Sequence, residues 1–105
     1  VRNALLVQSG RFFPLGQDAF AVVGRDHEDN LEILDNVPDD AELMELSDLP
    51  GPLAALIGCA GREEVDEVKE LVIRYSRYED VPLEDVKVLH PEQMREEWKA
   101  QAEGG

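Results

Sequence analysis

An apolar pattern between residues 62 and about 76 is the feature that most restricts how this chain can fold. Apolar side chains recur there at spacings of three and four residues, the period of one helical face: Val65, Val68, Leu71, Val72 and Tyr75. Glu70 precedes Arg74 by four residues, the order in which an ion pair supports a helix. Because an amphipathic helix of this length needs an apolar surface to cover, the sequence predicts a helix packed on a sheet.

Short apolar runs predict the strands of that sheet. They lie at residues 4–7, 19–23, 42–46, 53–57 and 86–89, and residues 11–16 connect the first two runs. Residues 42–46 also fit a single helical turn, although we favour a strand. The connections are too short for a full set of parallel crossovers. The predicted class is therefore α+β, with a mixed, largely antiparallel sheet of about five strands and helices on one face.

Two further helices are predicted from their start signals. Asp26 is a candidate N-cap for a short helix at residues 27–35, whose first turn contains the acidic residues that the helix dipole favours. Pro91 suits the first position of a C-terminal helix, in which Met94 and Trp98 lie four residues apart. We expect residues 1–100 to form a single domain, with two main helices and this C-terminal helix, and residues 101–105 to form a frayed tail.

The charge of the chain is strongly unbalanced. Its 24 Asp and Glu residues against 10 Lys and Arg residues give a formal net charge of -14. Repulsion at this level opposes compaction, and concentrated salt relieves it, which indicates a salt-loving cell; an ordinary acidic protein is the alternative. No apolar run approaches the roughly 18 residues of a membrane span, and the first residues do not resemble a signal peptide. We expect a cytoplasmic protein with no membrane partner.

The sequence offers no recognisable catalytic, cofactor or metal site. The chain has two histidines, His27 and His90, and neither has the setting of a hydrolytic triad. Residues 58–61 lack the further residues of a phosphate-binding loop. Cys59 either acts as a nucleophile at a helix N-terminus or is a small buried residue, and one cysteine cannot form a zinc site. We therefore expect a non-catalytic module.

Arginines beside aromatic residues are the candidate elements of a nucleic-acid site. Arg74 and Arg77 end the long predicted helix next to Tyr75 and Tyr78, and Arg11 precedes two phenylalanines. Proteins that bind single-stranded nucleic acid combine phosphate contacts from arginine with bases stacked on aromatic rings. Packing at the helix end and in a hairpin explains these residues equally well.

Three motifs then occur in the order of a known family. They are Val22-Val23-Gly24-Arg25-Asp26 with Glu28 and Asn30, then Asp48-Leu49-Pro50-Gly51-Pro52, then Tyr75-Ser76 with Val86-Lys87-Val88 as the last strand. From about residue 11 to residue 89 the chain resembles the NFACT-R domain, the RNA-binding module of the NFACT proteins of ribosome-associated quality control. That domain also occurs alone or attached to tRNA-thiolating enzymes. The resemblance implies a stand-alone RNA-binding module.

The candidate RNA-binding residues are Arg11, Arg25, Asn30, Arg74 and Arg77, and the candidate structural residues are Gly24, Asp26, Pro50 and Gly51. In the first motif, Gly24 can supply a tight turn, Asn30 can hydrogen-bond backbone across that turn, and Arg25 offers donors suited to phosphate. Alternatively, Arg25 neutralises Asp26 or a buried carboxylate, and the motif then marks the fold rather than a binding site.

The chain departs from the family pattern around the elbow formed by residues 50–52. Many members have a histidine where this chain has Glu45, and a Ser-His pair where it has Pro52 and Leu53. The Pro-Gly-Pro form is similar to the variant associated with tRNA thiolation. It therefore implies recognition of tRNA, as an accessory to tRNA modification or ribosome quality control, with a tRNA-modifying enzyme or a ribosomal factor as partner.

Two other functions stay open from the sequence. The chain could be a protein-protein adaptor that retains the fold without binding RNA. It could also be a ubiquitin-like modifier or sulfur carrier that uses Gly104 and Gly105, because such proteins end in a diglycine.

Overall fold

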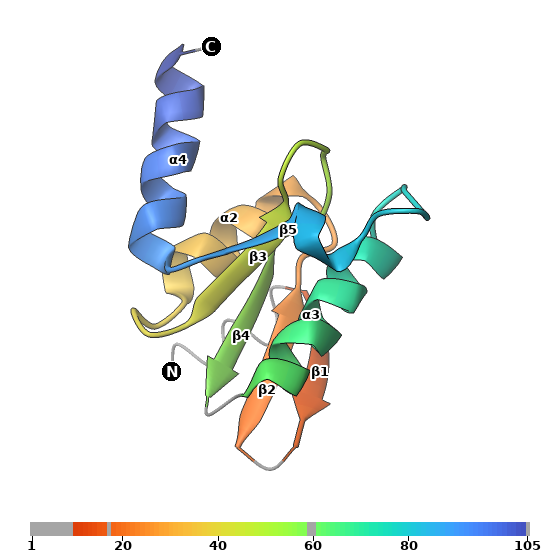
Figure 1. Ribbon diagram of the computed structural model, residues 1–105. Coiled ribbons are helices and arrows are strands. Elements are labelled where there is room, and N and C mark those ends of the chain that lie inside the picture. Colours follow the sequence, from red (N-terminus) through yellow and green to blue (C-terminus); the bar gives the residue numbers. More distant parts are fainter. Residues whose placement is uncertain (1–9, 17, 59–60, 105) are drawn as a thin grey trace.

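The strands of the computed structural model form one five-stranded sheet, in the spatial order β1-β2-β4-β3-β5 (Figure 1). The structure describes residues 10–16, 18–58 and 61–104. The strands are β1 (Arg11–Leu15), β2 (Ala19–Val23), β3 (Glu42–Leu46), β4 (Ala54–Gly58) and β5 (Val86–Leu89). The helices are α2 (His27–Asn36), α3 (Arg62–Arg74), α4 (Pro91–Gly104) and the short 3-10 helix η1 (Leu83–Asp85). The predicted α+β class is confirmed. All neighbouring strands in the described sheet pair antiparallel, so this sheet contains none of the parallel pairs that a mixed sheet would have.

The first described strand differs from the prediction. Residues 11–16 were predicted to connect two strands, but β1 pairs with β2 along its whole length, from Arg11 opposite Val23 to Leu15 opposite Ala19. Pro14 is compatible with this pairing because β1 lies at an edge of the described sheet, where one row of backbone donors needs no partner strand. The predicted strand at residues 4–7 lies outside the described residues.

Helices cover both faces of the sheet, whereas the sequence predicts helices on one face. Val22 belongs to a core formed with α2 and α4, while its neighbours Ala21 and Val23 belong to a second core formed with α3. Successive strand residues point to opposite faces, so a strand that is covered on both sides is apolar at nearly every position. The continuous apolar runs of β2 and β4 therefore reflect a core on each face.

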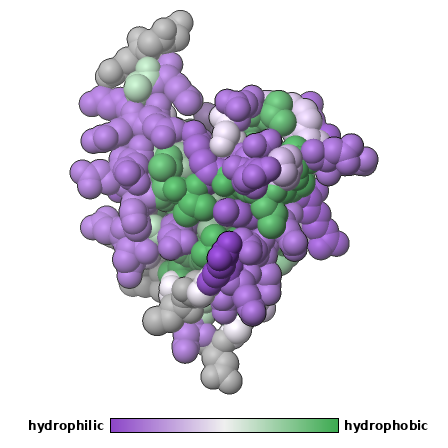
Figure 2. All heavy atoms as spheres, viewed as in Figure 1, coloured by the Kyte–Doolittle hydropathy of each residue, from purple (hydrophilic) through white to green (hydrophobic). Residues whose placement is uncertain are grey.

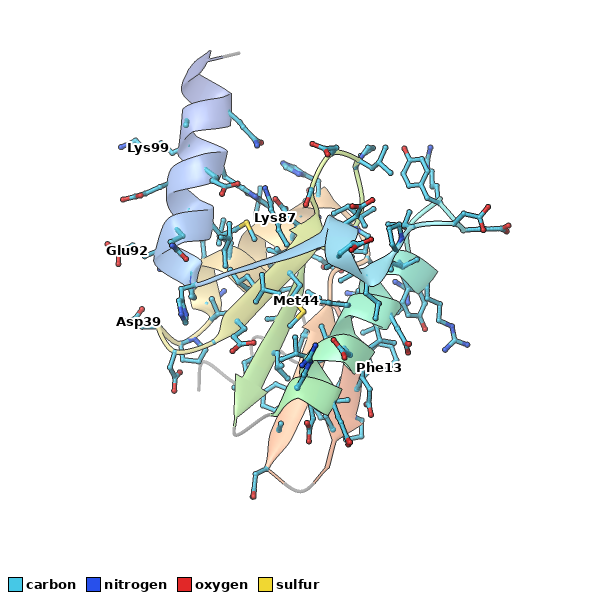
Figure 3. The ribbon with its side chains drawn as sticks, viewed as in Figure 1. Phe13, Asp39, Met44, Lys87, Glu92 and Lys99 are labelled. Carbon is cyan, nitrogen blue, oxygen red and sulfur yellow. The ribbon has the colours of Figure 1, made fainter. Side chains whose placement is uncertain are left out.

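The two main predicted helices are confirmed. In α3, Val68 and Val72 are fully buried in the core that includes Met44 of β3, a residue that Figure 3 shows between the sheet and α3. At the start of α2, the Asp26 carboxylate accepts a hydrogen bond of 2.9 Å from the backbone N–H of Asp29, as predicted for an N-cap. This cap fixes the entry of α2 beside the end of β2.

The C-terminal helix α4 begins at Pro91, as predicted, and packs on the α2 face. Met94 is fully buried there, and Trp98 packs against the same core. The Arg95 guanidinium donates to the Leu34 carbonyl, at 2.7 Å from Nη2 and 3.1 Å from Nε, and so joins α4 to α2. The helical backbone of α4 continues through Gly104.

The face of the molecule shown in Figure 2 is mostly hydrophilic. On the face in Figure 2, hydrophilic side chains surround a smaller central area of hydrophobic ones. No helix among the described residues has the length and apolar character that crossing a membrane requires.

Candidate nucleic-acid interface

A cleft of about 560 Å³ lies where the start of α2, the elbow and the end of α3 meet. Three arginines line it, Arg11, Arg25 and Arg77, together with Tyr75 and Tyr78. The rest of its lining is Gly24, Asp26, His27, Asn30, Pro50, Gly51, Pro52 and Ser76. We call this the arginine cleft. It brings together residues from each of the three motifs that the sequence singled out, although residues 86–88 of the third motif do not line it.

A hydrogen-bonded joint holds the elbow against the start of α2. The Gly24 N–H donates to the Leu53 carbonyl at 2.9 Å, and the Leu53 N–H donates to the Asn30 side-chain oxygen at 3.1 Å. A Cβ atom on Gly24 would overlap that same Asn30 oxygen, so the close approach requires glycine. Asn30 thus hydrogen-bonds backbone across the turn, as predicted, and its oxygen has a structural role.

Arg25 precedes α2 and is held by the carboxylate of Asp29 in the first turn of that helix. Its Nε lies 2.7 Å from Asp29 Oδ2, and its backbone N–H donates to the same oxygen at 3.0 Å. The hydrogen bond from Arg25 holds the pKa of Asp29 below its ordinary value. Asp29 is the buried carboxylate that the alternative reading of Arg25 required, whereas Asp26 serves as the cap. The Arg25 side chain is still 52% exposed and lines the cleft, so its structural and binding roles are compatible.

The end of α3 presents the aromatic side of the cleft. The Ser76 hydroxyl donates to the Ile73 carbonyl at 2.6 Å and accepts from the Tyr78 N–H at 3.2 Å, which fixes the turn after the helix. The Arg11 guanidinium lies over the Tyr75 ring, 4.5 Å from its centroid. Arg11 reaches this ring from β1, so a strand edge and a helix end together form one cation-aromatic surface.

The charge of the arginine cleft is opposite to that of the whole chain. Its lining contains three arginines and one acidic residue, Asp26, in a chain of net charge -14. Three further clefts on the described surface each contain two carboxylates and a single Lys or Arg. Local arrangement therefore gives this acidic protein one cleft with an excess of arginine among these four.

Arg74 lies apart from the other predicted site residues. It lines a different cleft, beside Glu67, Glu70 and Phe13. The arginine cleft is thus lined by four of the five predicted RNA-binding residues together with the four predicted structural residues. Arg74, the last residue of α3, lines the other cleft. The partner of Arg25 was missed in the sequence, although an arginine and an aspartate four residues apart at a helix start are a recognisable signal.

The matching family agrees with these observations. The family model described as the NFACT protein RNA binding domain matches residues 10–103 of the 105-residue chain. The chain belongs to this family. The NFACT RNA-binding domain is a binding module rather than a catalytic one, and its general role is to bind RNA. Searches of curated proteins and of solved structures find no match.

His90, Cys59 and the two terminal glycines are the other residues that the sequence singled out. Within the described ranges, no group of three or more His, Cys, Asp or Glu residues is placed to hold a metal ion. Cys59 and Gly105 lie outside the described residues. Gly104 is the last residue of α4. His90 lines a separate cleft with Asp39 and Glu92.

Proposed function

We propose that the arginine cleft is the RNA-contacting surface of this NFACT RNA-binding domain and that the RNA is tRNA. One observation carries the proposal: arginines gather in this cleft in a chain that is otherwise dominated by acids. A polyanion approaches an acidic protein favourably only where the local charge is positive. The cleft is also the place where the family motifs meet.

The side chains of the cleft suit two kinds of contact. Arg25 and Arg77 are exposed and present N–H donors to phosphate oxygens, with Arg25 oriented by Asp29. An unpaired base can stack on the outer face of the Arg11 guanidinium, which the Tyr75 ring supports from the other side. This arrangement favours a single-stranded or looped part of an RNA over a regular duplex.

High salt changes which of these contacts matters. We propose that the acidic surface adapts the protein to concentrated salt, where the gain from releasing counterions around phosphate is small. Stacking on Arg11 and Tyr75 then supplies most of the affinity, since it depends less on ionic strength. Phosphate contacts by Arg25 and Arg77 mainly position the strand.

The elbow supports the narrower proposal of tRNA as substrate and a tRNA-modifying enzyme or ribosomal factor as partner. Pro50 and Gly51 line the cleft, and their Pro-Gly-Pro context is similar to the variant associated with tRNA thiolation. Glu45, which replaces a histidine common in the family, is engaged on the other side of the elbow by Lys87 at 3.3 Å and Trp98 at 3.3 Å. Glu45 is not among the residues that line the arginine cleft.

Equilibrium binding to labelled RNA in concentrated potassium chloride tests the proposal. We expect saturable binding of a tRNA transcript, stronger competition by unlabelled tRNA than by a duplex of equal length, and crosslinks at residues of the arginine cleft. Absence of saturable binding at every salt concentration would remove RNA as the ligand. Equal competition by the duplex would remove the preference for unpaired RNA.

A protein-protein adaptor is the second candidate, and the structural use of the motif favours it. Gly24, Asn30 and the Arg25–Asp29 pair all stabilise the fold, so they would be retained in a domain that had lost RNA binding. Affinity capture from lysate at native salt, with and without nuclease, separates the two functions. A protein partner that survives nuclease, together with failure to bind tRNA, would favour the adaptor.

A further inference from the structure

A second cleft, of about 600 Å³, lies on the other side of the elbow. His27, Asn30, Pro50 and Gly51 line both clefts, so the elbow and the start of α2 form the ridge between them. The second cleft is further lined by Trp98 of α4 and Lys87 of β5. We call it the tryptophan cleft.

Two aromatic rings from different helices, His27 and Trp98, stack on each other in the tryptophan cleft. The rings of His27 and Trp98 are nearly parallel, with an interplanar angle of 11° and centroids 6.4 Å apart. His27 is exposed at the first turn of α2, while Trp98 is half-buried on α4. Because His27 is exposed, a further planar group can stack on the accessible side of this ring pair.

A chain of polar contacts holds the indole in place. Trp98 Nε1 donates to Glu45 Oε2 at 3.3 Å, and Lys87 Nζ lies 3.3 Å from Glu45 Oε1 and 2.6 Å from Glu97 Oε1. Figure 3 shows Lys87 on β5, close to α4. The indole orientation is thus fixed before any ligand arrives, which lowers the entropy cost of stacking.

We propose that the tryptophan cleft takes one unpaired nucleobase of the same RNA strand whose phosphates lie in the arginine cleft. The base stacks on the His27–Trp98 ring pair after the RNA strand crosses the ridge at Gly51. This inference rests on the proposed RNA binding and adds a second subsite to it.

The charge of the tryptophan cleft supports a base rather than a phosphate as its occupant. Its lining contains Glu45 and Asp48 against the single cation Lys87. Carboxylate oxygens repel phosphate, but they accept hydrogen bonds from the amino and imino N–H groups at base edges. Asp48 is exposed, whereas Glu45 already contacts Lys87 and Trp98, so Asp48 is the carboxylate of this cleft that we expect to accept a hydrogen bond from the base.

Trp98 is the single tryptophan of the chain and therefore reports on this cleft without labelling. The experiment measures binding of a fluorescently labelled tRNA transcript by anisotropy and, in parallel with unlabelled transcript, the quenching of Trp98 emission by acrylamide. We expect bound RNA to shield Trp98 from acrylamide. We also expect His27→Ala to weaken binding about fivefold, the typical effect of losing one stacking ring.

His90→Ala is the matched control, because His90 is also exposed but lines a cleft that excludes the elbow. Its affinity should equal that of the wild type, and thermal unfolding checks that both variants keep the fold. Binding that leaves Trp98 equally accessible, or equal affinities of the two variants, would overturn the second subsite while leaving the arginine cleft in place. Failure of the wild type to bind RNA would overturn both proposals.

Discussion

The arginine cleft and the tryptophan cleft share one ridge but differ in charge and in how their side chains are held. In the arginine cleft, Arg25 is tied to a buried carboxylate from the first turn of the helix that follows it. In the tryptophan cleft, Lys87 is tied to Glu45 and Glu97. Local charge can therefore differ in sign from the net charge of -14. The arrangement of side chains on either side of the elbow makes one cleft basic and the other acidic.

Breaking the shared ridge has the largest expected effect. Gly24→Ala places a Cβ against the Asn30 oxygen that accepts from Leu53, so we expect a loss of about 3 kcal/mol in the free energy of unfolding and disruption of both clefts. Chemical unfolding at fixed salt measures this change. Gly51→Ala is the control, since its Cβ would lie 3.1 Å from Leu46 Cδ1 and 3.6 Å from Ser76 Cβ, without overlap, and it should cost about 1 kcal/mol or less.

Reversing one arginine separates the arginine cleft from the rest of the surface. Arg77→Glu should lower affinity for tRNA by about 2 kcal/mol, or roughly thirtyfold, because it removes a charged donor and adds repulsion. Arg74→Glu carries the same change in charge a few residues away, outside the cleft, and should have little effect. Equal losses in the two variants, measured by anisotropy, would mean that general charge rather than the cleft controls binding.

Removing the carboxylate that orients Arg25 has a smaller, pH-dependent effect. The lowered pKa of Asp29 means that its stabilising effect is present above its unfolded pKa and is lost as pH falls through the folded pKa. Asp29→Asn should therefore reduce stability at neutral pH, and its difference from the wild type should shrink as pH falls below about 4 and disappear only below the lowered folded pKa. Unfolding curves of the variant and the wild type, recorded across this pH range, measure the difference.

The ion pairs of the tryptophan cleft give the smallest expected effect. Hydrogen bonding to Glu97, and secondarily to Glu45, raises the pKa of Lys87. Its stabilising effect is therefore complete at neutral pH and is lost only in strongly alkaline solution, as pH rises through the folded pKa. Lys87→Gln should cost about 0.5 kcal/mol at neutral pH. Lys99→Gln, on the exposed side of α4, is the control, and an equal cost for both would show that the pairs contribute nothing.

Much of the fold could be predicted from periodicity. The spacing of Val68 and Val72 identified α3, and the cap at Asp26 identified α2. The two faces of the sheet were harder to predict, because a buried apolar run such as β4 does not reveal which helix covers each side. β1 was missed because Pro14 interrupts its pattern, and only its position at the sheet edge makes that residue acceptable.

The site was predictable in part for a physical reason. Gly24 and Asn30 belong to a local turn, so their relation could be inferred from nearby residues. The grouping of Arg11 with Tyr75 depends on pairing of β1 with the sheet and on the end of α3, which are long-range features. For the same reason, neither the separation of Arg74 from Arg77 nor the approach of Trp98 to His27 could be predicted.

Titration of isotope-labelled protein with tRNA, followed by backbone amide chemical shifts, tests the central claim most directly. We predict the largest shifts at Gly24, Arg25, Arg77 and Tyr78, and little change around His90 on the cleft that excludes the elbow. Shifts that concentrate around His90, or spread evenly over the surface, would contradict the arginine cleft as the RNA-binding site.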